Sequence, residues 1–417
     1  MMAIIKNILV VILRWEASMV LKRHKPIVIG VTGSVGKTSA KEAIAGMLGD
    51  YYPTGKSPKS YNSELGVPLA VLGLENAWKS WHGWLSNLAR GFMRIWSRVP
   101  YPKYLVLEMG VDRPGDMDRM LGWIHPQVSV VTTIGDLPVH VEFFSGTDEV
   151  ASEKAKIVRE LDDGYAVLNR DDEQVYAMRS RTHANVLTYG FHKDADIRAS
   201  GYKLVIKKNM PAGISFTLHI HQEKHPIHID GIVGAQSVYA LLAAAAVGTA
   251  LGFRSLEVAE GLERYKSERG RLNLISGVTD SLILDDTYNS SPIAVDAALE
   301  VLASIPAKRR IAVLGDMLEL GKFSPDAHRR MGEVARGTAD LVVAVGIRSK
   351  SIEGADQWFA RSQDAGAFLR SIVQEGDVIL IKGSQGMRME YAVKAIMEDQ
   401  NRSRELLVRQ EAFWTTQ

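Results

Sequence analysis

A lysine and several hydroxyl residues follow glycines near the start of the chain, at a spacing that suits phosphate binding. The stretch runs Thr32-Gly33-Ser34-Val35-Gly36-Lys37-Thr38-Ser39, after the apolar run Ile27–Val31 and before residues 40–48, whose composition is helical. Glycines let backbone N–H groups approach phosphate oxygens, and the start of the following helix adds a positive dipole. Lys37 would neutralise the β- and γ-phosphates of ATP, and the Thr38 hydroxyl would bind Mg²⁺. We therefore predict an ATP-binding loop, although Val31 stands where the usual motif has its first glycine.

Carboxylates come at the ends of apolar runs that we expect to be strands. Glu108 ends the run Tyr104–Glu108, and Asp286 follows the run Leu282–Asp285. In open α/β sheets, ligands bind beyond the carboxyl ends of the strands, so a carboxylate there beside a phosphate loop is a candidate Mg²⁺ ligand. Taken singly, each residue also has a structural explanation, such as a salt bridge for Glu108 or a turn at Asp285 and Asp286.

The motifs, taken in chain order, resemble those of the Mur ligase family. The loop Thr-Gly-Ser-x-Gly-Lys-Thr-Ser resembles the family's form of the phosphate loop, and the resemblance extends from about residue 26 to about residue 395. The last three segments are most similar to members that add D-alanyl-D-alanine to a UDP-muramoyl tripeptide. The matching segments after the loop are Ser60–Pro68, Leu107–Gly110, His140–Phe144, Glu153–Ile157, Asn169–Asp172, Gly270–Arg271, Asp285–Pro292, Leu314–Gly321 and Lys382–Ser384.

The resemblance implies an ADP-forming ligase that makes an amide bond through an acyl phosphate. The residues that it implies at ATP are Thr32, Gly33, Ser34, Gly36, Lys37, Thr38, Ser39, Asn169, Arg271, Asp286, Tyr288 and Asn289. Those implied at Mg²⁺ are Thr38, Glu108, His140 and Lys154, the last as a carbamate, because CO₂ turns a lysine cation into an anionic oxygen ligand. Those implied at the substrates are Asn62, Asp316, Glu319, Lys382 and Ser384. The catalytic set among them is Lys37, Glu108, His140, Lys154 and Arg271.

The resemblance also implies the substrates and leaves alternatives open. We expect a cell-wall precursor carboxylate, an amino acid or dipeptide as the amine, and a monomeric chain. A folylpolyglutamate synthase or cyanophycin synthetase is a second possibility, which the Gly-Asp-Met-Leu-Glu-Leu-Gly run at Gly315–Gly321 disfavours. A ligase for a lipid-linked muropeptide is a third. A scaffold that hydrolyses ATP slowly is a fourth, and it is disfavoured because one chain retains Glu108, His140, Lys154 and Arg271.

The sequence departs from the family pattern in three places. Only about 25 residues precede the first strand, so we expect the family's N-terminal UDP-binding domain to be missing. Ser237 stands where the family has an asparagine near the adenine, which affects the expected nucleotide contacts. Ala77–Val99 reads as an inserted amphipathic helix, with tryptophans at three- and four-residue steps and arginines beside them.

The elements that position these residues are those of an α/β protein. Apolar runs alternate with helical patterns, which predicts a central P-loop ATPase domain with a parallel sheet over residues 26–270 and a Rossmann-like C-terminal domain over residues 271–417. Leu204–Ile229 alternates like antiparallel strands appended to the central domain. Fifty basic and 48 acidic residues give no electrostatic case for a nucleic-acid partner. The chain has no cysteine, which excludes disulfides and thiolate chemistry.

Residues 1–25 form a separate apolar segment, which we expect to be a helix. Its uninterrupted apolar run is too short to span a bilayer. One interpretation is a helix packed on the protein. The other is a helix that lies on the cytoplasmic face of the membrane, with Ala77–Val99 as a second contact, since both segments place basic residues beside apolar ones. We favour the packed helix and expect a cytoplasmic protein, while the second interpretation adds a peripheral contact with the inner face of the membrane.

Overall fold

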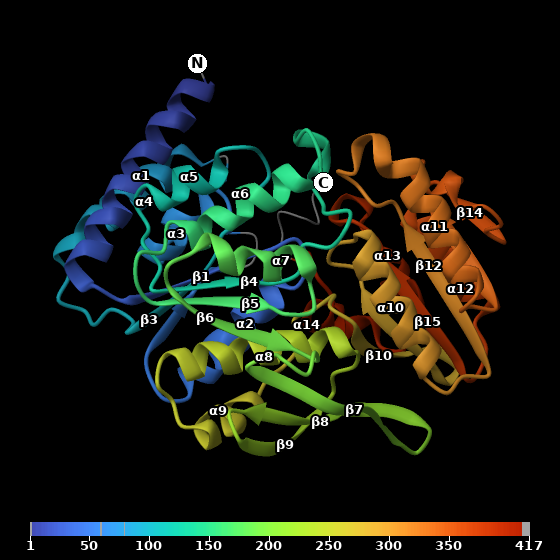
Figure 1. The fold of residues 1–417 in the computed structure, drawn as a ribbon. Helices are drawn as coiled ribbons and strands as arrows, with labels where there is room; N and C mark the ends of the chain where they lie inside the picture. Colours follow the sequence, from blue (N-terminus) through green and yellow to red (C-terminus); the bar gives the residue numbers. More distant parts are fainter. Residues whose placement is uncertain (1, 59–60, 79, 411–417) are drawn as a thin grey trace.

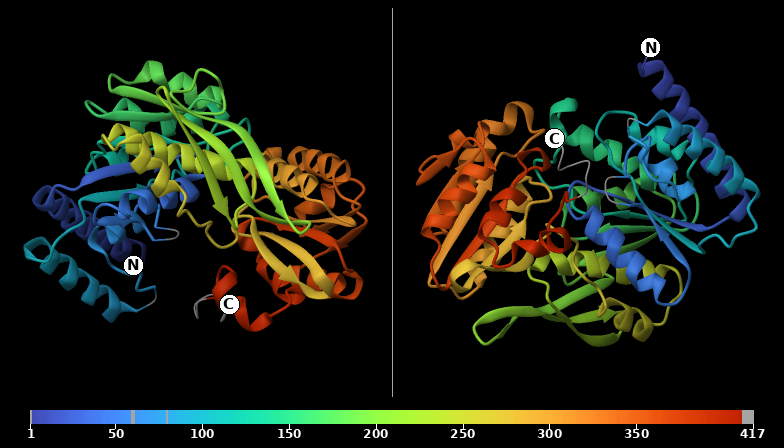
Figure 2. Two further views of the ribbon diagram at one scale, coloured as in Figure 1. Left: turned by 90° about the horizontal axis from the view of Figure 1, so that it is seen from below. Right: turned by 180° about the vertical axis from the view of Figure 1, so that it is seen from behind.

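The structure, a computed structural model, describes residues 2–58, 61–78 and 80–410, and side chains from residue 7 onward. Ser60 and Lys79, which belong to two segments singled out above, lie outside those ranges. Two sheets organise the chain, one of nine strands in its N-terminal part and one of six strands in its C-terminal part (Figure 1). The two parts lie side by side in all three views (Figures 1 and 2).

The first sheet has the strand order β2-β3-β1-β4-β5-β6-β7-β8-β9. Its strands pair in parallel as far as β7, and β7, β8 and β9 pair antiparallel. The bounds are β1 (Ile27–Thr32), β2 (Thr54–Lys56), β3 (Tyr104–Glu108), β4 (Val128–Val131), β5 (Tyr165–Asn169), β6 (Asn185–Gly190), β7 (Ile197–Lys207), β8 (Met210–Ile220) and β9 (Glu223–Asp230).

Helices cover both faces of this sheet, because successive residues of its buried strands point to opposite sides. Ile29 and Val106 pack with α2 (Lys37–Gly49), α8 (Ala235–Ala250) and α9 (Ser255–Leu262). Val28 and Leu105 pack on the other face. The helices of that second face are α1 (Met2–His24), α3 (Gly66–Leu72), α4 (Trp81–Trp96), α5 (Asp116–Leu121), α6 (Thr147–Arg159) and α7 (Glu173–Ala177).

The second sheet has the order β10-β11-β15-β12-β13-β14, and all of its pairs are parallel except β10 with β11. Its strands are β10 (Asn273–Gly277), β11 (Ser281–Asp286), β12 (Arg309–Gly315), β13 (Leu341–Val345), β14 (Gln357–Phe359) and β15 (Asp377–Lys382). Its helices are α10 (Pro292–Ser304), α11 (Ser324–Arg336), α12 (Ser362–Ile372), α13 (Glu390–Ile396) and α14 (Ser403–Leu406). Leu284 packs with α10 and α11, and Ile283 packs with α12 and α13.

Short 3₁₀ helices lie in the loops, and two of them face each other between the two parts of the chain. They are η1 (Val141–Phe143) and η4 (Gly321–Phe323). The others are η2 (Met178–Arg181), η3 (Val278–Asp280), η5 (Arg348–Ser351), η6 (Gln385–Met387) and η7 (Gln400–Arg402).

The predicted α/β architecture is confirmed, including the antiparallel strands of the central sheet. The two segments proposed as membrane contacts are both helices, α1 and α4. α1 packs by one side, through Leu13, Ala17 and Val20, into the core under α3. Within the part of the chain that the structure describes, no helix combines the length and the apolar character needed to cross a membrane.

Candidate active site

The phosphate loop connects the end of β1 to the start of α2. Gly33 has φ +141° and Gly36 has φ +85°, a region that other residues rarely adopt. A Cβ atom on Gly33 would lie 2.0 Å from the Thr132 hydroxyl oxygen, so the turn leaves no room for a side chain. No side chain caps the N-terminus of α2, and the N–H groups of its first turn are therefore available to an anion.

Glu108 stands next to this loop because β3 pairs with β1 in a register that sets Val31 opposite Glu108. Its side chain is 5% exposed. The Thr38 hydroxyl donates to Glu108 Oε2 at 3.0 Å, and Asn62 Nδ2 donates to Glu108 Oε1 at 3.3 Å. These contacts hold both carboxylate oxygens beside the loop, where a phosphate-bound cation would lie.

Two cations face the same space. Lys37 turns back so that its Nζ donates to the Ser34 carbonyl oxygen at 3.2 Å, and burial lowers the pKa of Lys37 below its ordinary value. The Arg271 guanidinium lies over the Tyr288 ring, 4.2 Å from its centroid, and its Nη2 is 3.5 Å from the Thr38 hydroxyl oxygen. Arg271 therefore reaches from the start of the C-terminal part of the chain to the phosphate loop.

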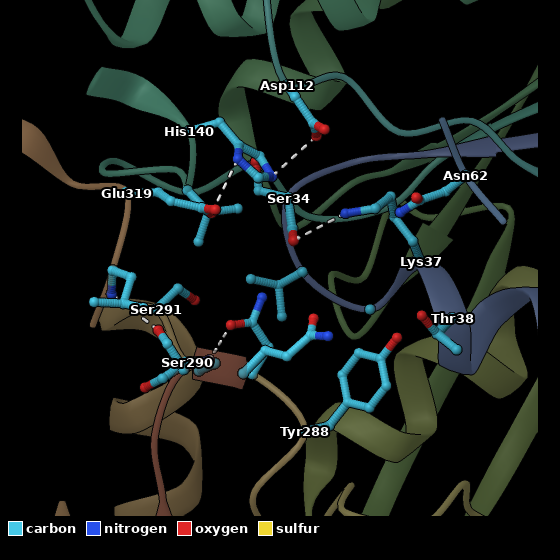
Figure 3. A pocket seen from close by; sticks show the side chains of 18 of the residues that line it. Ser34, Lys37, Thr38, Asn62, Asp112, His140, Tyr288, Ser290, Ser291 and Glu319 are labelled. Atoms are coloured by element: carbon cyan, nitrogen blue, oxygen red, sulfur yellow. Dashed lines mark hydrogen bonds and ion pairs between the residues drawn. The ribbon is translucent and has the colours of Figure 1, made fainter. Parts of the chain in front are cut away.

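A cavity of about 290 Å³ lies between these residues and the loops that follow β11, β12 and β15 (Figure 3). The residues singled out from the sequence that line it are Ser34, Gly36, Lys37, Thr38, Asn62, Glu108, His140, Arg271, Tyr288, Asn289, Glu319 and Ser384. Four buried polar atoms around it have no hydrogen-bond partner, namely Ser34 Oγ, Ser290 Oγ, Ser291 Oγ and Arg271 Nε. Buried polar atoms without partners are rare in proteins, so the cavity fits the phosphates of a nucleotide.

The same residues fit Mg²⁺ bound jointly with phosphate. Among the described residues, no three acidic or histidine side chains are grouped so that they could hold a metal ion alone. Mg²⁺ does not need such a group, because it keeps water ligands and usually takes one or two protein oxygens together with phosphate oxygens. Glu108 and Thr38 offer two such oxygens within 3.0 Å of each other.

A second cavity, of about 560 Å³, continues from the phosphate loop along α8 and α10. Its walls include the rings of Phe191, Tyr202, Tyr239 and Tyr265, which suits a nucleoside. Gln236 lines it with a buried Nε2 that has no hydrogen-bond partner. Of the residues singled out from the sequence, Ser39, Ser237, Asp286 and Lys382 line this second cavity alone, and Gly36 and Arg271 line both cavities.

Five predicted site residues line neither cavity. Thr32 donates its hydroxyl to the Met109 carbonyl oxygen, and Asn169 donates to the Thr133 hydroxyl. The remaining three are Gly33, Lys154 and Asp316.

Asp316 holds neighbouring loops together. Its carboxylate accepts from the backbone N–H of Ser349 at 2.7 Å and from the Ser349 hydroxyl at 2.6 Å. Its backbone carbonyl oxygen accepts from the Ser384 N–H at 3.0 Å. The predicted substrate contact of Asp316 remains a prediction.

Lys382 is not open to the cavity that Ser384 lines. Its side chain is 2% exposed, and its Nζ lies 2.6 Å from Asp286 Oδ2 and 2.9 Å from the Asn289 carbonyl oxygen. Burial lowers the pKa of Lys382, and the adjacent Asp286 carboxylate opposes that effect. Lys382 is thus placed to hold the loop after β11.

Lys154 lies on the buried side of α6 and is 1% exposed. Burial, and then the neighbouring charge of Lys37, lower its pKa from 10.5 to about 7. Asp112 is among the acidic groups that oppose this shift. A lysine in this environment is an uncharged amine for much of the time at neutral pH.

His140 bridges the two parts of the chain (Figure 3). Its Nε2 is 3.3 Å from Asp112 Oδ1, and its Nδ1 is 3.0 Å from Glu319 Oε2. The His140 side chain holds the pKa of Glu319 below its ordinary value. Both ring nitrogens therefore face carboxylates here, while the predicted role of His140 at a metal remains a prediction.

Sequence reasoning missed several residues that line the two cavities. The sequence motifs give no separate role to Asp112, which follows Glu108 by four positions. They also give none to Ser290 and Ser291, which lie inside the Asp285–Pro292 segment. Gln236 was also left without a role. Their positions could have indicated a role, because polar residues that directly follow a predicted strand or precede a predicted helix often lie at a ligand site.

Comparison with known proteins agrees with this geometry. Residues 91–248 match the Mur ligase middle domain, and residues 270–385 match the Mur ligase glutamate ligase domain. A Mycobacterium tuberculosis UDP-N-acetylmuramoyl-tripeptide–D-alanyl-D-alanine ligase is 30% identical over 403 residues, which cover 89% of this chain and 73% of that protein. The chain belongs to the Mur ligase family. Mur ligases are ATP-dependent peptide ligases of cell-wall precursors and use Mg²⁺.

Two further relatives extend the comparison. The Bacillus subtilis enzyme of the same name is 29% identical over 387 residues, which cover 89% of this chain and 76% of that protein. The MurF ligase of Thermotoga maritima in complex with ADP superimposes with a TM-score of 0.77 and 26% identity, over 93% of this chain and 83% of that one. This Mur ligase therefore shares its fold with a protein that binds ADP.

Proposed function

We propose that this Mur ligase joins D-alanyl-D-alanine, or a similar amine, to a peptide carboxylate of a cell-wall precursor, through an acyl phosphate. The support is one cavity in which a phosphate loop, Glu108 and Arg271 face the loops after β11, β12 and β15. The names of the relatives described above support the choice of amine and acceptor. The proposed reaction consumes ATP and a cell-wall precursor. We therefore propose that the protein acts in the cytoplasm.

In the first step, an oxygen of the acceptor carboxylate bonds to the γ-phosphorus of ATP, and the bond from that phosphorus to the β,γ-bridging oxygen breaks to release ADP. Negative charge on the transferred group is spread over its oxygens, so catalysis rests on positioning and charge stabilisation. Lys37 and Arg271 supply positive charge to those oxygens. Thr38 and Glu108 would hold Mg²⁺, which would supply further charge neutralisation when bound.

In the second step, the amine nitrogen attacks the acyl carbon, phosphate leaves, and the nitrogen loses a proton. The amine is assigned to the C-terminal side of the cavity, because the phosphate loop lines the other side and would hold ATP there. Glu319 and Ser384 lie on that side. Glu319 carries a carboxylate that can attract an ammonium, and the Ser384 Oγ is held in place by the Leu318 N–H at 2.9 Å.

We propose further that Lys154 is carbamylated. A neutral Nζ attacks CO₂, a nitrogen–carbon bond forms, and one proton is released to leave an anionic carbamate. The supporting geometry is a fully buried amine beside Lys37. An ammonium there would repel Lys37 in a medium of low dielectric constant, whereas a carbamate would attract it.

The experiment is mass spectrometry of products together with measurement of phosphate release. UDP-linked and lipid-linked muropeptides are offered with ATP, Mg²⁺ and D-alanyl-D-alanine. The expected result is one product with the mass of both substrates less one water, and phosphate release that requires both. ATP hydrolysis at the same rate with and without every acceptor and amine would overturn the proposal in favour of a slow ATPase.

A further inference from the structure

Two helices at one end of the molecule, α1 and α4, lie side by side (Figures 1 and 2). Gly91 of α4 lets Glu16 of α1 approach so closely that a Cβ atom there would lie 2.1 Å from Glu16 Oε2. Further along both helices, the Arg23 guanidinium lies 5.8 Å from the centroid of the Trp96 ring. Because the second contact is later in both helices, α1 and α4 run in the same general direction.

Each of these helices buries one apolar side and leaves another apolar side open. On α1, Leu13, Ala17 and Val20 are buried, and on α4, Ile95 is buried. The open side chains of α1 are Ile8, Val11, Ile12 and Trp15, which are 55%, 54%, 36% and 50% exposed. The open side chains of α4 are Trp81, Leu85, Phe92, Met93 and Trp96, which are 63%, 55%, 52%, 61% and 65% exposed. We call these nine residues the α1–α4 surface.

The two open sides lie on neighbouring helices that are in contact with each other. Trp96 belongs to the open side of α4, and Arg23 of α1 lies against it. Open side chains recur at steps of three and four residues on each helix, so each set lies along one line. Nine exposed apolar side chains on two neighbouring helices are unusual on a monomeric protein and indicate an interaction site.

Charge around this surface is strongly one-sided. Residues 1–25 and 76–103 contain ten of the chain's 50 lysines and arginines, but only one of its 48 acidic residues. That one is Glu16, which is 2% exposed between the two helices. These segments carry a formal +9 and the other residues −7, which together give the +2 of the whole chain. Five of the eight tryptophans also lie in these segments.

We propose that the α1–α4 surface docks the protein on the face of a bilayer that contains anionic lipids. Lipid phosphates complement the basic residues, and the apolar side chains enter the boundary between headgroups and acyl chains. Tryptophan is enriched at that boundary. A second copy of the chain fits less well, because two such surfaces would bring their basic residues together, and Glu16, the one acidic residue of these two segments, is buried.

Docking of this kind leaves the active site free. None of the nine residues lines the phosphate cavity or the nucleoside cavity. Changes on the surface are therefore expected to alter membrane binding without altering turnover of a soluble substrate. The inference does not depend on the proposed ligation, since vesicle binding is measured without substrates.

The test is co-sedimentation of the full chain with vesicles of phosphatidylcholine that contain about 30% phosphatidylglycerol. We expect binding at about 0.05 M salt that weakens strongly at about 0.5 M, because salt screens the charge attraction. Leu85→Glu with Phe92→Glu, and separately Lys22→Glu with Arg98→Glu, should each weaken partition by about tenfold or more. Leu256→Glu is the matched control, since Leu256 is 53% exposed but lies on α9.

Each outcome decides the matter. Binding that is lost in both double variants and kept in Leu256→Glu supports the proposal. Absence of the full chain from the vesicle pellet at low salt overturns it, as does equal binding of wild type and both double variants. A wild-type dimer in analytical ultracentrifugation that becomes monomeric in Leu85→Glu with Phe92→Glu, without vesicle binding by either, overturns it in favour of an interface between copies. Unchanged melting temperatures show that the variants fold.

Discussion

At the scale of single residues, the chemistry depends on side chains that meet at the ends of β1 and β3. Glu108 accepts hydrogen bonds from Thr38 and Asn62, and Arg271 reaches Thr38 from beyond the central sheet. Each of these contacts joins residues that are far apart in the sequence. All four residues line the cavity, so substitutions in them should alter phosphate transfer.

Glu108→Gln is expected to lower kcat/KM by about 10²-fold or more, because it replaces an anionic oxygen that Mg²⁺ prefers with a neutral amide of the same shape. Steady-state phosphate release over a range of Mg²⁺ concentrations measures the effect. Glu160→Gln serves as the control, because Glu160 is exposed at the end of α6. Unchanged kcat/KM and Mg²⁺ dependence in Glu108→Gln would remove this residue from the mechanism.

Lys154→Ala is expected to lose most of its activity and to regain part of it with acetate or formate, which can return an anionic oxygen to the space. Burial lowers the pKa of Lys154 to about 7, so in the unmodified protein the amine that reacts with CO₂ becomes scarce below about pH 7. At limiting CO₂, the carbamate should therefore form less completely below about pH 7, and wild-type activity should fall with it. Phosphate release measures both effects. Lys156→Ala is the matched control, and a fully active Lys154→Ala protein contradicts the carbamate.

Most residues that line the site could be predicted from the sequence, but their hydrogen-bond and ion-pair partners could not. Lys37, Thr38, Glu108 and Arg271 follow from motif order, and the structure places all four around one cavity. The same motif order predicted Lys382 as a substrate contact, which stays a prediction, but it did not indicate that the Lys382 Nζ contacts Asp286 and the Asn289 carbonyl oxygen. Motif spacing shows which residue type stands at a strand end. It does not show whether that side chain is paired with a neighbouring carboxylate.

At the scale of elements, the packing of α1 against α4 contains an unusual group. Glu16 is buried between these helices, and its Oε2 has no hydrogen-bond partner. Burial raises the pKa of Glu16 from 4.5 to about 7. The folded chain thus binds a proton at Glu16 more readily than the unfolded chain does. The contribution of Glu16 to the free energy of unfolding therefore falls as pH rises from about 4.5 to about 7.

Glu16→Gln is expected to remove this pH dependence and to raise the free energy of unfolding at pH 8 by about 1–3 kcal/mol, because the amide never ionises. At pH 4 the two proteins should differ little, since Glu16 is then protonated. Urea unfolding at both pH values measures the difference. Glu263→Gln is the control on an exposed site. Equal stability of Glu16→Gln and wild type at pH 8 would show that water or a neighbouring group satisfies the carboxylate.

Element positions were predicted best where strands are buried on both faces. β3 begins and ends at the residues expected from its apolar run, because a parallel strand covered by helices is apolar almost throughout. β2 and β14, with three residues each, give no such signal. α1 was expected as a helix, but the sequence left open which of its sides is covered, since that depends on α3 and α4.

At the scale of the whole molecule, the two parts of the chain meet where η1 faces η4. The His140–Glu319 pair joins them, but both side chains are partly exposed, and such a pair contributes about 1 kcal/mol or less. This pair alone is too weak to hold the site closed, and other contacts between the two parts add to it, such as the packing of Leu137 and Val233 into the core of the C-terminal part. The sequence could not predict the contact, because no local pattern relates two loops in different domains.

Gly321 provides a test of this contact. Its φ is +53°, and a Cβ atom there would lie 2.8 Å from Glu142 Cβ, across the junction. Gly321→Ala should therefore prevent the close approach of the two loops and lower kcat/KM by about tenfold or more, since misplacement of about 1 Å can cost about 10²-fold. Steady-state phosphate release measures the loss, and circular dichroism shows that secondary structure is kept.

Gly337→Ala is the matched control for that variant. Gly337 ends α11 with φ −71°, and the nearest atom to a Cβ there is the Val334 carbonyl oxygen at 3.6 Å, which is ordinary contact. Gly337→Ala should keep wild-type kcat/KM. Gly321→Ala should lower kcat/KM, and it should also lower the protection that ATP gives against proteolysis between the two parts of the chain. If Gly321→Ala turned over like Gly337→Ala, the approach of η4 to η1 would not be required for the reaction, and the cavity would have to be completed by the loops after β11 and β15 alone.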